Sequence, residues 1–216
     1  MNRVAARPIT VAYQGGPGAN GERAIAAHWK GAATPVSMRS FDALITTVAD
    51  GIADYGVVPV WNSTIGEVRA ATEALMRAGE RVDPVTELLL PVGHALIGLP
   101  GARIAELRAV GSHHAALDQC RTFLRGHPHI YPIAAWDTAG AARQLAELAA
   151  GCDADQWVTP WYAGLADGRP DALAVIANRD VAAPLGLEVL ADEIQDQPDN
   201  HTRFVVIQPR RASWRW

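Results

Sequence analysis

Short apolar segments alternate with helical stretches along almost the whole chain, and this alternation limits the possible folds more than any other feature. The apolar segment 9–13 is followed by a glycine-rich turn at 14–18, and residues 22–29 then place apolar side chains on one helical face. Repetition of strand, turn and helix is typical of α/β proteins with many parallel strands. We therefore expect an α/β fold with mixed sheets and helices on both faces.

The next unit along the chain shows clear start and stop signals. Ser40 is a candidate N-cap for a helix over 41–50, and Gly51 is suited to end it. The same periodicities predict further strands at 36–38, 54–60, 109–111, 130–134, 172–177, 187–190 and 204–207, and further helices at 64–78, 113–124 and 139–149.

The domain organisation follows from one irregular apolar stretch, residues 85–99, which Pro91, Gly93 and His94 interrupt. This stretch indicates a crossing between two lobes, and the last two strands are expected to return the chain to the first lobe. We predict one lobe from residues 1–90 with 187–216 and a second from 91–186. Two sheets joined by two crossings would enclose a cleft.

Composition excludes several classes of protein. The net charge of -4 arises from interspersed signs, so no basic stripe is present that would bind nucleic acid. No window approaches the roughly 20 apolar residues of a membrane span, and the first residues lack a signal-peptide core. We expect a cytoplasmic protein without a membrane or nucleic-acid partner.

The chain's cysteines, Cys120 and Cys152, are interpreted as buried or incidental thiols. Neither belongs to a CxxC motif, no HExxH motif is present, and no histidine has a metal-ligand spacing. We therefore expect no metal site.

A distinctive motif stands near the C-terminus. Residues 186–196 read Gly-Leu-Glu-Val-Leu-Ala-Asp-Glu-Ile-Gln-Asp, and residues 200–204 read Asn-His-Thr-Arg-Phe. Other blocks precede it in a fixed order: Ala-Tyr-Gln-Gly at 12–15, Asp-Tyr-Gly-Val-Val-Pro-Val at 54–60, Asn-Ser at 62–63, Ser-His at 112–113, Gln-Cys at 119–120 and Asp-Thr-Ala-Gly at 137–140. Together these blocks resemble the prephenate dehydratase family over about residues 8 to 208.

The resemblance implies a two-lobed fold like that of type II periplasmic binding proteins, with substrate in the cleft. It implies removal of water and carbon dioxide from prephenate, giving phenylpyruvate, or from arogenate, giving phenylalanine. No cofactor is implied, and a homodimer is the family expectation. The matched region implies no C-terminal regulatory (ACT) domain, so feedback inhibition by phenylalanine through such a domain is not expected.

The resemblance also implies the site residues. Thr202 contacts and helps to protonate the departing hydroxyl, and Asn62 is the second catalytic candidate. Arg203 either grips a substrate carboxylate through its planar fork or locks the lobes together. The remaining candidates for substrate binding are Phe204, Ser63, Trp61, Thr138, Ser112 and His113. Asn62 and Ser63 are expected between a strand and a helix, where helix N-terminal amides meet anions.

Thr138 and the histidines have simpler interpretations. The pair Asp137–Thr138 has the composition of a helix N-cap as well as that of a ligand contact. A lone histidine such as His94, His113 or His114 is more often structural than catalytic.

The chain departs from the family pattern at several polar positions. Trp61 stands where the family has a glutamate, Ala115 where many members have a glutamine, and Asn20-Gly21 where Tyr-Ser is typical. An indole cannot replace a carboxylate in charge, although its face can pack on a ring and its N–H can donate. These departures predict a pocket of altered shape and charge.

Three functions remain open. The first is a dehydratase acting on prephenate or arogenate. The second is a divergent member acting on prephenate or an amino-substituted analogue, for instance a non-aromatising decarboxylase, although Thr202 argues against that reaction. The third is a non-catalytic module that binds a small acid. The irregular segment 153–170 is either a lid or a surface loop, and the tail Trp214-Arg215-Trp216 has no assigned role.

Overall fold

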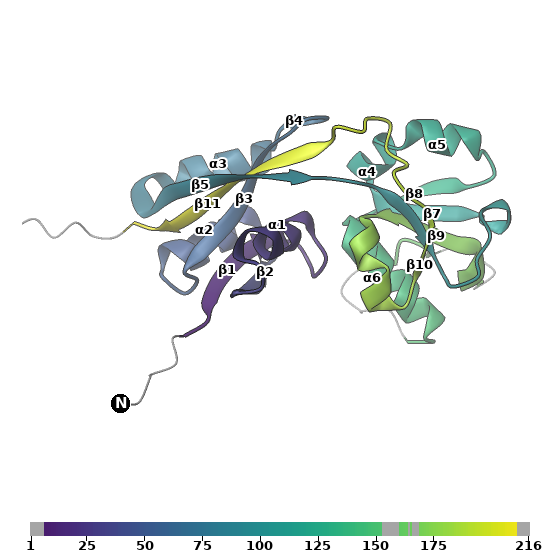
Figure 1. Cartoon of the computed structure of the whole chain (residues 1–216), viewed down its shortest axis with the longest axis horizontal. Helices are drawn as coiled ribbons and strands as arrows, with labels where there is room; N and C mark the ends of the chain where they lie inside the picture. The colour runs from purple at the N-terminus through teal and green to yellow at the C-terminus, as the bar shows by residue number, and fades with distance from the viewer. Residues whose placement is uncertain (1–6, 153–159, 164, 166–168, 211–216) are drawn as a thin grey trace, which may run out of the picture. The chain divides into compact units, whose positions relative to one another are not determined.

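The computed structural model describes residues 7–152, 160–163, 165 and 169–210 (Figure 1). The chain forms two compact units, which we call unit 1 (Met1–Pro91 with His201–Trp216) and unit 2 (Val92–Asn200). The two-lobed α/β fold predicted from the sequence is confirmed. Residues 153–159, 164 and 166–168 of the irregular stretch, which was expected to be a lid or a surface loop, and the tail 211–216 lie outside the described residues.

The second crossing between the units differs from the prediction. We expected the chain to leave the second lobe before residue 187, but it leaves after Asn200. The reason is that strand β10 (Glu188–Ala191) pairs antiparallel with β6 (Ala95–Gly98) and so completes the sheet of unit 2.

Unit 1 is built on a mixed sheet of order β2-β1-β3-β11-β5, with β4 paired to β3. Strands β1, β2 and β3 are parallel, whereas β11 runs antiparallel to both β3 and β5. The strands are β1 (Ile9–Gln14), β2 (Ala33–Met38), β3 (Tyr55–Asn62), β4 (Gly66–Glu67), β5 (Val82–Pro91) and β11 (His201–Pro209).

Helices cover both faces of this sheet. Helix α1 (Asn20–Trp29) packs with Tyr13, Phe204 and Val206 on one face. Helices α2 (Phe41–Ala49) and α3 (Arg69–Ala78) pack with Val58 and Ile207 on the other, and the short helix η1 (Gly79–Arg81) follows α3. Alternate residues of β11 thus face α1 and the α2–α3 pair in turn.

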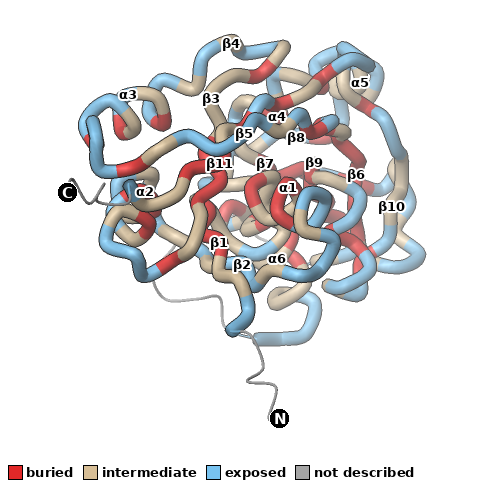
Figure 2. Tube along the Cα trace, turned by 60° about the vertical axis from the view of Figure 1, so that its left-hand side comes forward, coloured by how far each residue is buried: buried red, intermediate tan, exposed pale blue. Residues whose placement is uncertain are grey.

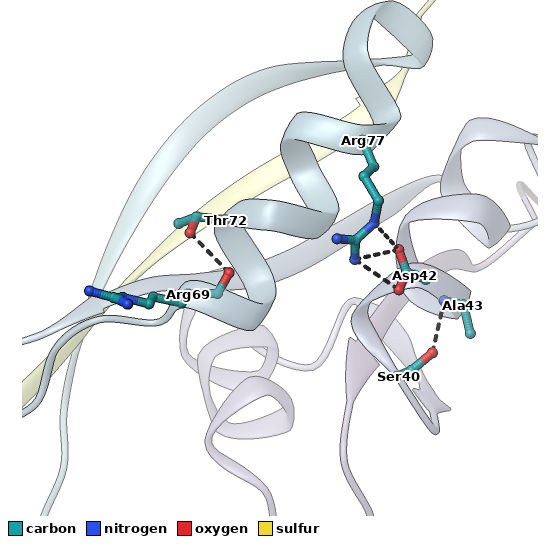
Figure 3. A network of polar contacts seen from close by, with 6 residues as sticks. All are labelled: Ser40, Asp42, Ala43, Arg69, Thr72 and Arg77. Carbon is teal, nitrogen blue, oxygen red and sulfur yellow. Dashed lines mark hydrogen bonds and ion pairs between the residues drawn. The ribbon is translucent and has the colours of Figure 1, made fainter.

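The start of α2 agrees with the sequence prediction. The Ser40 side chain accepts a hydrogen bond from the Ala43 amide at 3.1 Å, and Gly51 follows the helix with φ +71°. Beside this cap, Arg77 of α3 donates from Nη2 to both oxygens of Asp42, each at 3.0 Å (Figure 3). Both side chains are more than half exposed, so this ion pair adds little to stability.

Replacing Ser40 by alanine is expected to lower the free energy of unfolding by about 1 kcal/mol, because the Ala43 amide loses its acceptor. Ser40→Asp keeps an acceptor at the same place and is the matched control. Chemical denaturation of both variants measures the effect, and equal loss in the two would show that the cap is not its source.

Unit 2 is built on a mixed sheet of order β10-β6-β9-β7-β8. Strands β7 (Ala109–His113), β8 (Tyr131–Ala135) and β9 (Leu173–Ala177) are parallel, and β6 is antiparallel to β9 and β10. The helices are α4 (His114–Asp118), α5 (Arg121–Gly126) and α6 (Thr138–Ala149), with short helices η2 (Ile104–Glu106), η3 (Pro170–Ala172), η4 (Arg179–Val181) and η5 (Ala183–Leu185).

In each sheet, strands with a neighbour on both sides are more buried than the strands at the edges (Figure 2). The central strand β9 is buried throughout, whereas the edge strands β5 and β8 are largely exposed or half-buried. Helix α6 and Trp161 pack on one face of the unit 2 sheet, and α4 with Cys120 packs on the other. In the described part of the chain, no helix has the length and apolar composition needed to cross a bilayer.

Two predicted helices differ from those observed. The helix expected over 64–78 begins only at Arg69, because residues 66–67 turn back and pair with Trp61 and Asn62 of β3. The helix expected over 113–124 is divided into α4 and α5 at Gln119–Cys120. Both differences lie next to residues of the predicted site.

The topology gathers strand ends on one edge of each sheet. In unit 1 β1, β2 and β3 run in the same direction, and the carboxyl end of β3 extends past those of β1 and β2 to where β11 begins at His201. In unit 2 the carboxyl ends of β7, β8 and β9 share an edge. Ligands of open α/β sheets bind outside the carboxyl ends of the strands, so these edges are where site residues are sought.

Candidate functional site

The centre of the candidate site is the pair Thr202 and Asn62, which are register partners on β11 and β3. Asn62 Nδ2 donates to Thr202 Oγ1 at 3.0 Å, and both side chains are buried. A threonine hydroxyl has one hydrogen to donate and lone pairs to accept. Because the amide supplies a hydrogen to Oγ1, the hydroxyl's own hydrogen stays available to another acceptor, and no described residue accepts it.

Asn62 is held by the backbone around it. Its Nδ2 also donates to the His201 carbonyl at 3.0 Å, and its Oδ1 accepts the amides of Thr64 at 3.0 Å and Ile65 at 3.2 Å. Both hydrogens and both lone-pair directions of the amide group are thus engaged within unit 1. Asn62 thus holds the Thr202 hydroxyl in place, and its catalytic role stays a prediction.

Ser63 ties the beginning of β11 to the end of β3. The Ser63 amide donates to the His201 carbonyl at 2.9 Å, and Ser63 Oγ accepts the His201 amide at 2.9 Å. The expectation that Asn62 and Ser63 precede a helix N-terminus is wrong, because β4 intervenes before α3. Ser63 therefore supports the strand that carries Thr202.

Trp61 and Arg203 lie on the opposite face of the sheet from Thr202. They are register partners one residue away from the Asn62–Thr202 pair, and successive strand residues point to opposite faces. The Arg203 guanidinium lies 3.7 Å from the Glu87 carboxylate, and the Trp61 ring lies 5.6 Å from that of His201. Both residues were expected to bind substrate beside Thr202, and their strand positions point them away from its hydroxyl.

Replacing Trp61 by phenylalanine is accordingly expected to change kcat/KM by less than about threefold, as for substitutions remote from the reacting groups. Phenylalanine keeps a ring against His201 but lacks the indole N–H. Steady-state kinetics measure the effect. A loss as large as that caused by removing the Thr202 hydroxyl would return Trp61 to the substrate pocket.

Phe204 and Ser112 are core residues rather than surfaces for a ligand. Phe204 is 1% exposed and packs with Tyr13, Ile25 and Leu90 under α1. Ser112 is fully buried, and its Oγ donates to the Ile176 carbonyl at 2.5 Å. Neither can contact substrate in this structure. A sequence motif does not separate residues that touch a ligand from residues that support those that do.

His113 and Thr138 lie at the strand-end edge of unit 2. His113 ends β7, and its Nδ1 accepts the Ala115 amide at 3.3 Å. Burial lowers the pKa of His113 below its ordinary value, the nearby His114 lowers it further, and Asp137 acts in the opposite direction. The ring is therefore neutral at pH 7 and carries its hydrogen on Nε2.

Thr138 is the first residue of α6, and Asp137 is the N-cap residue just before it. Asp137 caps the helix by accepting the Gly140 amide. Thr138 is half-buried at the same edge as His113, since β7 and β8 are parallel and His113 pairs with Ala135. The edge thus offers hydroxyl and imidazole groups to a polar ligand.

Another polar cluster had no assigned role in the sequence. Gln119 Oε1 lies 2.6 Å from His94 Nε2 and 3.0 Å from Asn200 Nδ2, and the His94 amide donates to Gln195 Oε1 at 2.9 Å. Because an amide oxygen only accepts, His94 Nε2 carries a hydrogen. The cluster explains the Ile-Gln-Asp and Asn positions of the motif: they fix the segment that leads to His201. Its members are far apart in the sequence, and no local pattern in the chain predicts their contact.

The two cysteines lie in different environments. Cys120 is buried, and burial together with Asp196 raises its pKa to about 12, so it is a poor nucleophile. Cys152 is exposed. Within the described ranges, no cluster of His, Cys, Asp and Glu side chains is suited to hold a metal ion.

Comparison with known proteins gives a consistent family. The family model described as prephenate dehydratase matches residues 11–212. An arogenate dehydratase/prephenate dehydratase of Arabidopsis thaliana is 32% identical over 199 residues, which are 92% of this chain and 45% of that protein. A bifunctional chorismate mutase/prephenate dehydratase of Neisseria gonorrhoeae is 32% identical over 202 residues, 93% of this chain and 50% of that protein. The chain spans about half the length of these relatives.

Solved structures agree with the fold. A prephenate dehydratase from Arthrobacter aurescens in complex with L-Phe has a TM-score of 0.77 at 26% identity, covering 94% of this chain and 61% of that one. GqqA, described as a quorum-quenching acylase, has a TM-score of 0.74 at 28% identity, covering 96% of this chain and 66% of that one. Two different activities are thus named on similar folds, while the sequence match over most of the chain is to dehydratases. This chain belongs to the prephenate dehydratase family.

Proposed function

We propose that this chain catalyses the decarboxylative dehydration of prephenate to phenylpyruvate, or of arogenate to phenylalanine, and so serves phenylalanine biosynthesis. The observation that carries the proposal is the Thr202 hydroxyl, which receives a hydrogen bond from Asn62 at 3.0 Å and keeps its own hydrogen for a ligand. Membership of the family supports the same reaction.

The chemistry needs little more than such a donor. The bond to the ring carboxylate breaks and releases carbon dioxide, its electron pair forms the last double bond of the aromatic ring, and the hydroxyl leaves from the opposite carbon. The leaving oxygen gains negative charge and takes up one proton to become water. A hydroxyl fixed by a buried amide stabilises that charge without reorganising, and the proton it gives is replaced from solvent.

The remaining substrate contacts are proposed on the strand-end edges. His113, with the Nε2 hydrogen of its neutral ring, and Thr138, with its hydroxyl, stay candidate substrate-binding residues of unit 2. Arg203 is not used, because its guanidinium is directed to Glu87 on the other face of the sheet. No step of the reaction needs a cofactor.

The other candidate functions fit the site less well. A decarboxylase that retains the hydroxyl has no use for a positioned donor at Thr202. An acylase needs an activated nucleophile, but Thr202 Oγ1 is hydrogen-bonded by the Asn62 amide, which cannot take its proton, and burial raises the pKa of the Cys120 thiol to about 12. A module that only binds a small acid does not explain the buried Asn62–Thr202 pair.

The proposal is tested by incubating the purified chain with prephenate and, separately, with arogenate. Phenylpyruvate is followed by its absorbance in alkali and phenylalanine by chromatography. Formation of either product supports the proposal. A non-aromatic dihydro product would assign the decarboxylase, and binding without turnover would assign the module. The cytoplasmic location and the homodimer stay predictions.

A further inference from the structure

Arg23 is a half-buried cation of unit 1 that lies near the start of β11. It belongs to α1, and its Nη1 donates to Asn20 Oδ1 at 3.1 Å and lies 3.5 Å from the Pro91 carbonyl oxygen. Pro91 is the last residue of β5 and the register partner of His201, which directly precedes Thr202. Helix α1 thus brings a guanidinium to the end of the sheet that carries the Thr202 hydroxyl.

Arg23 and Thr202 also lie on the same side of this sheet. Side chains two residues apart on a strand point to the same face, and Thr202 precedes Phe204, which packs under α1, by two residues. The partner of Thr202 on β5 is Leu90, which packs in the same cluster. Neighbouring strands are about 4.8 Å apart, so a guanidinium that reaches Pro91 lies on the order of 10 Å from Thr202.

The proposed substrate carries two carboxylates, and its binding is favoured by positive charge on the Thr202 face. Arg203 does not supply this charge, because its guanidinium is directed to Glu87 on the other face. Arg23 is suited to the task, since a guanidinium can form two parallel charge-assisted hydrogen bonds with a carboxylate. Its contacts with Asn20 and Pro91 both involve Nη1, whereas the group carries five N–H donors.

The partner of Arg23 belongs to a departure from the family pattern. Asn20-Gly21 stands where Tyr-Ser is typical, and Asn20 is the first residue of α1. Residues three apart on a helix are neighbours, so the Asn20 side chain can accept from Arg23 and orient its guanidinium. The departure therefore supplies a support for a cation near Thr202.

We propose that Arg23 is a substrate-binding residue that holds the side-chain carboxylate of prephenate or arogenate, which remains in the product. This inference rests on the proposed function. The ring carboxylate loses its negative charge as it becomes carbon dioxide, so a cation held on it would stabilise the substrate more than the transition state and slow the reaction. The side-chain carboxylate keeps its charge throughout, so Arg23 binds substrate, transition state and product alike.

The experiment compares Arg23→Gln, Arg23→Lys and Arg77→Gln with the unchanged chain, using whichever of the two substrates the chain converts. Arg23→Gln is expected to raise KM, and the inhibition constant of the aromatic product, about tenfold to a hundredfold, with kcat within about threefold. Arg23→Lys should recover part of the loss, because it keeps the charge but not the planar fork. Arg77→Gln removes an equal charge from α3 on the other face and should match the unchanged chain.

Ionic strength gives a readout that a merely structural role of Arg23 would not move. The KM of the unchanged chain should rise with added salt, because salt screens the attraction between the guanidinium and the carboxylate. The rise should be smaller in Arg23→Gln and unaltered in Arg77→Gln.

Unchanged KM and product inhibition in Arg23→Gln would overturn the inference while leaving the dehydratase proposal intact. An equal rise of KM in Arg77→Gln would also overturn it, because the net charge of the chain would then be the cause. A raised KM with unaltered product inhibition would place Arg23 on the departing carboxylate and overturn it too. If the unchanged chain converts neither substrate, calorimetric binding of prephenate decides: binding weakened only by Arg23→Gln supports the contact, and equal or no binding overturns it.

Discussion

Replacing Thr202 by valine is expected to lower kcat for prephenate about a hundredfold to ten-thousandfold, the usual range for loss of a positioned proton donor. Valine has nearly the shape of threonine, so the packing of β11 is kept. The hydroxyl that meets the leaving oxygen is lost, and Asn62 Nδ2 loses an acceptor at 3.0 Å. KM should change far less than kcat, because the hydroxyl acts mainly as charge develops in the transition state.

Thr202→Ser is the control for this experiment. Serine restores a hydroxyl that can accept from Asn62, so most of the activity should return. Thermal unfolding of both variants separates loss of activity from loss of folding. If Thr202→Val kept kcat within about threefold, Thr202 would have no part in the chemistry.

Replacing Trp161 by alanine is expected to cost about 3–5 kcal/mol of stability, the range for truncating a large buried aromatic side chain. Trp161 is 6% exposed in the core on the α6 side of the unit 2 sheet, and its Nε1 donates to the Ala141 carbonyl at 3.1 Å. Its ring lies over Gly111, where an added Cβ would come within 2.3 Å of a ring atom. Since a domain has only about 5–15 kcal/mol to lose, unit 2 should unfold at much lower denaturant.

Two further variants identify the cause of that loss. Gly111→Ala adds a methyl group against the ring and should also destabilise, whereas Trp136→Ala removes an exposed tryptophan of the same unit and should change stability by about 0.5 kcal/mol or less. Chemical denaturation measures all three. A Trp161→Ala variant as stable as Trp136→Ala would show that Trp161 does not pack in the core.

The sequence by itself determined the α/β class, the helix start at Ser40 and the family, and it selected Thr202 as the catalytic candidate. These depend on local signals: apolar periodicity, a capping hydroxyl, and a motif whose residues are close together in the chain. The Ser40 cap was predictable because donor and acceptor are only three residues apart.

Only the tertiary structure decided what each motif residue contacts. Asn62 and Thr202 are 140 residues apart, and their contact exists because β11 returns antiparallel to β3. The same register sends Trp61 and Arg203 to the other face, since neighbouring strand residues alternate. Unit 2 extends past β10 because β10 pairs with β6. The Gln119 side chain holds His94 and Asn200 together because both contact its one oxygen. Long-range pairing of strands sets these contacts, and no local pattern in the chain encodes it.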